Sequence, residues 1–404
     1  MTWDTKTLGD ICEITSSRRI FAHEYLSDGV PFYRGKEIVE KFNGAQSPST
    51  ELFISRNRFE EIVDKHGAPR EGDLLLTSVG TLGFPYLVGL GEEFYFKDGN
   101  LTWFRPGKNL VSEFFYYWLI TPQGRAELGK STIGTSQSAY TIELLKKMRI
   151  SLPSLAEQSE LAAVLSAYDS LIANNRRRMA LLEDSARLLY NEWFVRLRFP
   201  GYEHTCIIDG VPEGWERRTA FESMQVLSGG TPKTSVPNYW DGEIPFYTPK
   251  DAINGVWVTD CERRVTEEGL KNCNSKLYPK ETIFVSARGT VGKLNMAQKP
   301  MVMSQSCYAP VGKDHLSQSF VYAAMQAAVD SLRQHAVGAV FDAIVVDTFK
   351  RINLLVPPPV MISLFDDTAH PILEQVENLT LQNQKLLTAR DLLLPRLMSG
   401  EIAV

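Results

Sequence analysis

Residues 74–83, LLLTSVGTLG, recur further along the chain as residues 283–292, IFVSARGTVG. Each stretch is a run of strand-forming residues that ends in a Gly-Thr-x-Gly turn, and Gly80 corresponds to Gly289 at an offset of 209 residues. The pattern predicts a buried strand that delivers hydroxyl groups, and in the second copy Arg288, to a tight backbone turn. The glycines suit positive φ angles or the close approach of a polyanion, while an ordinary hairpin with two structural glycines accounts for the pattern equally well.

Other landmarks recur around these two turns in the same order. Their offsets lie between 204 and 214 residues, and they are Trp3, Pro31-Phe32-Tyr33, Gly134, Pro153 and Asn175, matched by Trp215, Pro245-Phe246-Tyr247, Gly338, Pro357 and Asn383. A repeat that keeps its spacing while most of its residues differ indicates one structural unit present twice. We therefore expect two similar but non-identical sites.

A long amphipathic stretch closes each copy. Apolar or small residues recur there at alternating steps of three and four, at Leu161, Val164, Tyr168, Leu171, Met179, Leu182, Ala186, Leu189 and Trp193, and again at Ala369, Ile372, Val376, Leu379, Leu386, Arg390, Leu393 and Leu397. This spacing is typical of the seam of a long helix that packs on another helix. One asparagine, Asn175 or Asn383, lies at the centre of each seam. Because neither helix can bury its stripe alone, we predict an intramolecular antiparallel pair.

The length of these helices suggests a spacer. The first seam covers 33 residues, which at ~1.5 Å per residue gives a rod of about 50 Å. An antiparallel pair with a globular domain at each end would hold the domains at a fixed separation of about one and a half turns of B-DNA. Two such readers would recognise a split sequence with a gap of unread base pairs.

The predicted fold class is therefore α+β. Two globular domains in a tandem pseudo-twofold repeat, residues 1–152 and 205–356, are separated by two long antiparallel coiled-coil helices within residues 153–200 and 357–404. Each globular part is long enough to bury a core of its own.

The composition and the net charge exclude several classes of protein. No apolar run approaches the ~18 residues of a membrane-spanning helix, and the N-terminal residues show no signal-peptide pattern, so we expect a cytoplasmic protein without a membrane partner. The five cysteines are scattered and the histidines show no His-x-x-x-His pattern, so we expect no zinc site. A net charge of -5 argues against a surface covered in basic residues. It is compatible with DNA binding through clustered cations or inside a larger complex.

Known catalytic patterns are missing from the sequence. A P-loop is excluded because Ala287 replaces its first glycine and Leu294 follows the lysine. A restriction-type nuclease core needs an acid before an Asp/Glu-x-Lys tripeptide, and Asp4-Thr5-Lys6 has none before it. An amino-group DNA methyltransferase needs an Asn/Asp-Pro-Pro-aromatic loop, whereas Pro357-Pro358-Pro359 follows Val356 and is typical of a rigid hinge. We predict a chain without a catalytic site or a cofactor of its own.

Polar loops near the turns are the candidate DNA contacts. Short hydroxyl or glycine residues followed by a cation can bind phosphate oxygens, and aromatic pairs beside cations can enter a groove. Ser and Gln can contact either phosphates or base edges. Solvated surface loops share this composition. Phe32 and Phe246 are expected in the core, whereas the neighbouring tyrosines are expected to face a groove. The candidates are Ser17, Arg18, Arg19, Tyr33, Arg34, Lys36, Ser78, Thr81, Thr135, Ser136, Gln137 and Tyr140 in the first copy, and Thr231, Lys233, Tyr247, Lys250, Arg288, Thr290, Lys293 and Phe341 in the second.

The run Arg176-Arg177-Arg178 is a weaker candidate because it lies in the middle of the first predicted helix. Arginines on the flank of a coiled coil are usually solvated or paired with acids such as Glu183 and Asp184. We expect little contact with DNA there.

Taken together, the pattern resembles the DNA-specificity subunits of type I restriction-modification systems. The resemblance covers essentially the whole chain and rests on the order of the duplicated motifs. The motifs are the Gly-Thr-x-Gly turns, Leu152-Pro153-Ser154-Leu155-Ala156-Glu157-Gln158 at the start of the first helix, Leu189-Tyr190-Asn191-Glu192-Trp193-Phe194 near its end, and residues 390–400, RDLLLPRLMSG, at the end of the second. One departure is Val360-Met361-Ile362, which stands where the first copy has Ala156-Glu157-Gln158 and suggests different docking of a partner.

This resemblance implies a function. The globular parts would be target-recognition domains, each of which reads one half of a bipartite asymmetric site in double-stranded DNA, and the helices would be spacers. Two modification subunits would dock on the chain and supply the methyltransferase with its S-adenosylmethionine, and restriction subunits that translocate DNA would join them in some complexes. The rival interpretations are a stand-alone DNA methyltransferase or nuclease, and a coiled-coil scaffold that binds only proteins.

Overall fold

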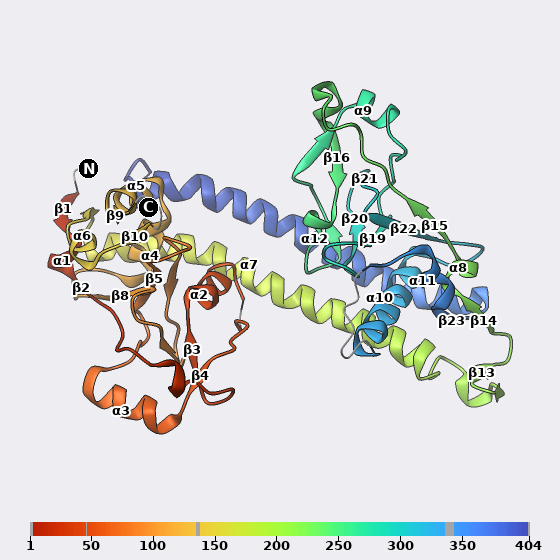
Figure 1. The fold of residues 1–404 in the computed structure, drawn as a ribbon, viewed down its shortest axis with the longest axis horizontal. Coiled ribbons are helices and arrows are strands. Elements are labelled where there is room, and N and C mark those ends of the chain that lie inside the picture. Colours follow the sequence, from red (N-terminus) through yellow and green to blue (C-terminus); the bar gives the residue numbers. More distant parts are fainter. Residues whose placement is uncertain (1–2, 46, 135–137, 336–342, 403–404) are drawn as a thin grey trace. The chain divides into compact units, whose positions relative to one another are not determined.

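The chain folds into two compact units (Figure 1). The computed structural model describes residues 3–45, 47–134, 138–335 and 343–402. The first unit comprises Met1–Ala173 with Lys385–Val404, and the second comprises Asn174–Gln384. Each unit therefore contains one globular α+β part and a segment of both long helices. The division into four segments at the helix ends stays a prediction.

Two small sheets form the centre of the first unit. The larger has the order β2-β8-β5-β6 and is antiparallel throughout, with β2 Cys12–Thr15, β8 Leu101–Pro106, β5 Leu74–Thr77 and β6 Pro85–Leu87. The smaller has the order β4-β3-β7, with β4 Phe53–Ile54, β3 Val30–Tyr33 and β7 Tyr95–Phe96, and its β3–β7 pair is parallel. A further antiparallel pair, β1 Asp4–Thr7 with β11 Arg149–Leu152, joins the start of the first globular part to its end. A short hairpin pairs β9 Thr132–Ile133 with β10 Ala139–Tyr140.

The second unit repeats this order of strands. Its larger sheet runs β15-β22-β19-β20-β17, with β15 Met224–Ser228, β22 Cys307–Gly312, β19 Ile283–Ser286, β20 Leu294–Ala297 and an added edge strand, β17 Trp257–Val258. Its smaller sheet runs β18-β16-β21, with β18 Arg263–Val265, β16 Trp240–Tyr247 and β21 Val302–Met303. The antiparallel pair β14 Glu216–Thr219 with β23 Asn353–Val356 again joins the start of the globular part to its end. The duplication predicted from the sequence is therefore a duplication of sheet topology.

Helices accompany the sheets in both units. In the first unit they are α1 Leu8–Ile11, α2 Gly35–Phe42, α3 Arg56–His66, α4 Ser112–Ile120, α5 Pro122–Lys130 and α6 Ile142–Lys146. In the second they are α8 Ala220–Ser223, α9 Glu267–Lys271, α10 Gln318–His335 and α11 Val346–Arg351. The most apolar of these short helices is α4, in which Phe114, Phe115 and Trp118 are buried.

The two long helices begin after different signals. α7, Leu155–Tyr190, follows a capping box in which the Ser154 hydroxyl accepts from the Glu157 amide (3.3 Å) and the Glu157 carboxylate accepts from the Ser154 amide (3.3 Å). α12, Pro359–Met398, starts at a proline, whose fixed φ suits the first turn. A short π-helical segment, Asn191–Val195, follows α7.

The residues of the predicted seam are buried or half-buried, with the exception of Leu171. Leu161 and Asn175 on α7 are buried, but Leu171 is 51% exposed and Ile172 is 3% exposed. Assigning Leu171 to the seam was wrong: a spacing of three and four residues can be phased in two ways at that turn, and a shift of one residue rotates a helical position by about 100°. Within the first unit, Leu161 and Leu165 of α7 share a core with Leu394 of α12.

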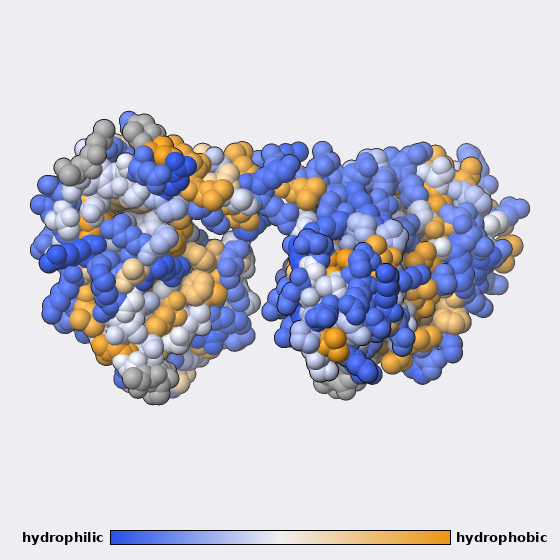
Figure 2. All heavy atoms as spheres, turned by 90° about the horizontal axis from the view of Figure 1, so that it is seen from above, coloured by the Kyte–Doolittle hydropathy of each residue, from blue (hydrophilic) through white to orange (hydrophobic). Residues whose placement is uncertain are grey.

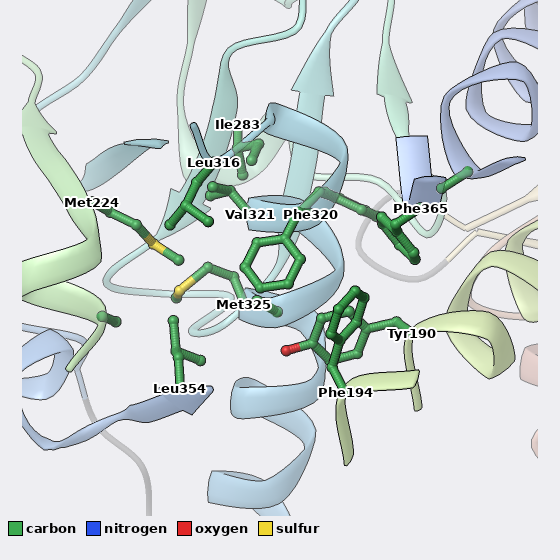
Figure 3. Packing of buried hydrophobic residues seen from close by; sticks show 14 of the residues in the cluster. Tyr190, Phe194, Met224, Ile283, Leu316, Phe320, Val321, Met325, Leu354 and Phe365 are labelled. Atoms are coloured by element: carbon green, nitrogen blue, oxygen red, sulfur yellow. The ribbon is translucent and has the colours of Figure 1, made fainter. Parts of the chain in front are cut away.

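In the second unit the ends of the long helices pack with α10. Tyr190 and Phe194 lie against Phe320 at ring-centroid distances of 5.7 Å and 5.0 Å, and Phe194 lies 5.2 Å from Phe365 (Figure 3). Aromatic rings at these separations add packing energy to the apolar area that they bury. This cluster fixes the helices to the globular part that carries the second glycine turn.

The outer surface is mixed in polarity. On the face drawn in Figure 2, hydrophobic residues in orange form small patches among hydrophilic residues in blue on each unit. Among the residues that the structure describes, no helix combines the length and the hydropathy that a bilayer crossing requires.

Candidate nucleic-acid interface

The two glycine turns have the same backbone geometry. Gly80 and Gly83 have φ values of +80°, and Gly289 and Gly292 have φ values of +77° and +76°, all in the left-handed region that favours glycine. The Gly83 amide donates to the Thr77 carbonyl (2.8 Å), as the Gly292 amide does to the Ser286 carbonyl (2.9 Å). The expected positive φ angles are confirmed, and each turn projects two backbone positions, including an exposed threonine, from the end of a buried strand.

A second polar segment is bonded to each turn. In the first unit the Tyr140 amide donates to the Ser78 carbonyl (3.0 Å), and in the second the Ile344 amide donates to the Ala287 carbonyl (3.0 Å). These pairs keep the offsets of the sequence repeat. Tyr140 and Ile344 therefore contact corresponding positions at the two turns.

The serine and glycine loops lie at the next strand. The Ser17 hydroxyl donates to the Phe96 carbonyl (2.7 Å), and the Gly230 amide donates to the Met303 carbonyl (3.1 Å). Arg18 is exposed, and its backbone amide donates to the Tyr95 hydroxyl (2.8 Å). These contacts hold the loops in place, and the Arg18 side chain is exposed.

Two connecting loops, 97–100 in the first unit and 304–306 in the second, lie beside the glycine turns. Neither loop was among the DNA contacts predicted from the sequence. The Lys97 amide donates to the Tyr33 carbonyl and the Ser304 amide to the Tyr247 carbonyl, both at 2.9 Å. The Ser78 amide donates to the Asn100 carbonyl (2.8 Å), as the Ala287 amide does to the Ser306 carbonyl (2.9 Å). The two loops have no identical residue at corresponding positions, so a comparison of repeated residues does not detect them. The polar runs between two predicted strands, KDGN and SQS, are the signal that was available.

Exposed cations border the site in the second unit. Lys233, Lys250 and Arg288 are exposed. The Thr290 hydroxyl donates to the Pro249 carbonyl (2.9 Å), and the Lys293 ammonium bonds the Asn254 side chain. The turn that carries Arg288 is thus tied to the loop that carries Lys250, and these two exposed cations lie on neighbouring loops.

Three of the four candidate cations of the first unit pair with acids. Arg19 pairs with Asp98 (2.9 Å), and Lys36 pairs with Glu51 (3.0 Å). Arg34 pairs with the buried Glu37 (2.8 Å), and this hydrogen bond raises the pKa of Arg34 above its ordinary value. Arg34 therefore has a structural partner at the start of α2, whereas Arg18, Arg19, Lys36 and Thr81 are exposed.

Three predicted contact residues are buried, which corrects the expectation. Tyr33 and Tyr247 are 7% and 0% exposed, and burial raises the pKa of Tyr33 to about 12. We expected them to face a groove on the assumption that only Phe32 and Phe246 point inward. Both faces of β3 and of β16 are covered, because the tyrosine and the phenylalanine of each strand belong to different cores. Ser78 is 3% exposed, and its hydroxyl bonds that of Thr102 (2.6 Å).

Part of the second polar segment is not described. The candidates Thr135, Ser136, Gln137 and Phe341 lie outside the described residues. Tyr140 is half-buried, and its hydroxyl lies near the Arg125 guanidinium, which donates to the Gly83 carbonyl. Burial lowers the pKa of Arg125. Arg125 thus stabilises the first glycine turn through its hydrogen bond to the Gly83 carbonyl, and it is half-buried.

The shape of the first unit and the cations near its loops are compatible with the binding of a polyanion. In the first unit a cavity of about 430 Å³ is lined by Ser17, Arg18, Trp103 and Arg105, and the Arg105 guanidinium stacks 3.7 Å from the Trp103 ring. Backbone turns, hydroxyl groups and cations on adjoining loops can bind phosphate oxygens and base edges. Arg177, in the middle of α7, is exposed and lies on no such loop.

The start of α12 differs from that of α7 in its partners. Gln158 is buried, accepts from the Val111 amide (2.9 Å) and donates to the Asn109 carbonyl (3.2 Å). In the second copy the apolar Met361 and Ile362 are buried in the core instead. The departure noted in the sequence exchanges a hydrogen-bonded amide for apolar packing. Its effect on docking stays a prediction.

Comparison with known proteins points to one family. The family model described as "Type I restriction modification DNA specificity domain" matches residues 1–184 and 212–388. The MjaIX type I restriction enzyme specificity subunit of Methanocaldococcus jannaschii is 25% identical over 421 residues, which cover 100% of this chain and 94% of that protein. The HindI specificity subunit of Haemophilus influenzae is 22% identical over 401 residues, covering 83% of this chain and 87% of that protein.

A solved structure has the same fold. The crystal structure of the type I restriction-modification S subunit from M. genitalium aligns with a TM-score of 0.60 at 14% identity, over 98% of this chain and 96% of that one. At this identity the likeness concerns the fold, and it extends across both copies of the repeat.

Proposed function

We propose, because the chain belongs to the type I restriction modification DNA specificity domain family, that it is the non-catalytic DNA-recognition subunit of a type I restriction-modification complex. Each unit would read one half of a bipartite, asymmetric site in double-stranded DNA. The unread base pairs between the halves would be set by α7 and α12.

One observation supports this proposal above the others. Both units present a glycine turn with nearly the same φ angles and the same backbone hydrogen bonds to two neighbouring segments, yet the exposed side chains around the turns differ. Arg18 and the ion pair of Arg19 with Asp98 occupy the first unit, whereas Thr231, Lys250 and Arg288 occupy the second. A shared backbone with different side chains is what two readers of two different sequences require.

The chemistry of methylation would come from partners. We propose that two modification subunits dock on this chain and bind S-adenosylmethionine, that restriction subunits join in complexes that cleave DNA, and that the assembly acts in the cytoplasm. This chain would contribute sequence recognition and a docking platform.

Mapping of methylated bases tests the proposal. The full chain would be co-expressed with a candidate modification subunit, and the host genome sequenced by a single-molecule method that detects methylated bases. We expect one asymmetric motif in two parts with a constant gap, which disappears when the specificity chain is omitted. Methylation without the chain, or a motif in one uninterrupted part, would contradict the proposal. A scaffold that binds only proteins would leave target and scrambled duplexes bound equally.

A further inference from the structure

Residues 304–306 occupy a central place in the second unit. The Ser304 amide donates to the Tyr247 carbonyl (2.9 Å), and the Ser306 carbonyl accepts from the Ala287 amide (2.9 Å). The preceding carbonyl, that of Met303, accepts from Gly230 (3.1 Å). The segment is thus held by the strand that leads to Lys250, by the glycine turn and by the serine-glycine loop. It is further tightened by the hydrogen bond of the Cys307 amide to the Ser304 carbonyl (3.1 Å).

Gln305 projects from the middle of this segment and is exposed, although Ser304 on one side is buried. The Thr231 hydroxyl donates to the Gln305 side-chain oxygen. Within the part of the chain that the structure describes, the side-chain nitrogen of Gln305 has no recorded partner, so its two N–H groups are available to a ligand. An amide anchored through its oxygen loses less conformational freedom on binding than a free one.

The corresponding place in the first unit has a different chemistry. Asp98 lies in the loop that matches 304–306, since the backbone bonds of Lys97 and Asn100 repeat those of Ser304 and Ser306. Asp98 pairs with Arg19 (2.9 Å), which lies in the loop that matches the one carrying Thr231. One unit therefore presents an arginine held by an acid, and the other presents a glutamine held by a hydroxyl.

We propose that Gln305 is a specificity-determining residue that reads an adenine in the half-site of the second unit, and that Thr231 is its positioning residue. Glutamine pairs with adenine because its amide accepts from N6 and donates to N7, whereas arginine suits guanine. The Gln305 oxygen keeps a second lone pair for N6 while it accepts from Thr231. This inference rests on the proposed function, and it assigns a base to a residue of the same interface.

Methylation mapping with variants of the assembled complex is the first test. We expect Gln305→Ala to relax one A·T position in one half of the motif, with roughly ten- to a hundredfold less discrimination there. The other half should stay unchanged. Gln225→Ala, which removes an exposed glutamine on β15, is the matched control and should leave the whole motif intact. A motif unaltered by Gln305→Ala would overturn the inference while leaving the proposed function in place.

A modified duplex makes the test specific to the atoms involved. Replacing that adenine by 7-deazaadenine keeps the Watson–Crick pair but removes the N7 acceptor. The wild-type complex should then lose affinity, and the Gln305→Ala complex should lose nothing further, when both are titrated by fluorescence anisotropy at fixed salt. Independent, additive losses would overturn the pairing. A wild-type complex that methylates no motif would refute the proposed function itself, and with it the inference.

The positioning role has its own readout. Thr231→Val removes the hydroxyl with little change of shape and should relax the same A·T position as Gln305→Ala, whereas Thr231→Ser should restore it. A Thr231→Val effect at another position, or equal effects of valine and serine, would contradict the assignment. The thermal midpoint of each variant, compared with that of Gln225→Ala, separates loss of reading from loss of folding.

Discussion

The side-chain nitrogen of Asn175 donates a hydrogen bond to the side-chain oxygen of Asn383 across the helix pair of the second unit, over 3.0 Å. The same nitrogen donates to the Gln382 side-chain oxygen (3.2 Å), and both asparagines are buried. One turn further, the Thr380 hydroxyl contacts the Met179 sulfur (3.3 Å), so the two helices are antiparallel here. A polar pair in an apolar seam fixes the register, because any shift would bury an amide without a partner.

Removal of one member of this pair should destabilise the helices. We expect Asn383→Ala to lower the free energy of unfolding by about 1–3 kcal/mol, because the buried Asn175 amide loses an acceptor. Calorimetric unfolding of the purified chain would measure the effect. Asn174→Ala is the matched control, since that neighbouring asparagine is exposed. Equal midpoints for the two variants would show that the asparagine pair does not stabilise the seam.

Exchange of one globular part should change one half of the target. Replacing residues 1–152 by the corresponding part of a relative should alter one half of the methylated motif, because the reading loops of the two units belong to separate globular parts. The other half and the pairing of β14 with β23 should be unaffected. The measurement is single-molecule methylation mapping with a common modification subunit. A change in both halves would refute the division of labour between the units.

Repeated landmarks were sufficient to predict the duplicated architecture. The glycine turns, the Pro-Phe-Tyr segments and the central asparagines keep their order because each has a local physical role: a left-handed φ, a buried strand, or a paired amide in a seam. The helices follow from periodicity, although the exact phase does not: at the turn around Leu171, Ile172 is buried instead. There the sequence allows two phases, and packing in the folded chain selects one.

The candidate interface was less predictable because it depends on tertiary contacts. Tyr33 and Tyr247 look like groove residues in sequence, yet cores on both sides of their strands bury them. Arg34 looks like a free cation, but it pairs with Glu37 and Glu51. Conversely, Gln305 belongs to a loop with no residue repeated in the other copy, and only its backbone bonds reveal its place.

Matched insertions in both helices should lengthen the unread gap. We expect four residues added after Asn175, with four more added directly before Asn383, to extend the pair by about 6 Å at ~1.5 Å per residue. That corresponds to about one or two base pairs at ~3.4 Å each. Methylation mapping would measure the gap, and a variant with four substituted but no inserted residues on the exposed face is the control. An unchanged gap with full activity would show that the helices do not set the spacing.

The final prediction concerns charge and salt. Because the chain has a net charge of -5, the isolated protein should bind duplex DNA weakly and lose that binding steeply as salt rises, as expected when a few Lys and Arg contacts to phosphate dominate. Addition of the modification subunit should tighten binding and introduce sequence preference, since it brings further phosphate contacts.

Variants of two arginines can distinguish contacts to bases from contacts to phosphates in that complex. Arg288 is exposed on the second glycine turn, whereas Arg177 is exposed in the middle of α7. Arg288→Ala should weaken binding to the specific duplex by about 1–3 kcal/mol and relax one half-site, because arginine reads guanine edges through two hydrogen bonds. Arg177→Ala should cost little on any duplex. Titration of both variants against specific and scrambled duplexes at one salt concentration decides between the roles. Equal losses on the two duplexes for Arg288→Ala would reduce Arg288 to a phosphate contact, and a loss for Arg177→Ala as large as that for Arg288→Ala would place DNA along the helix instead of at the turn.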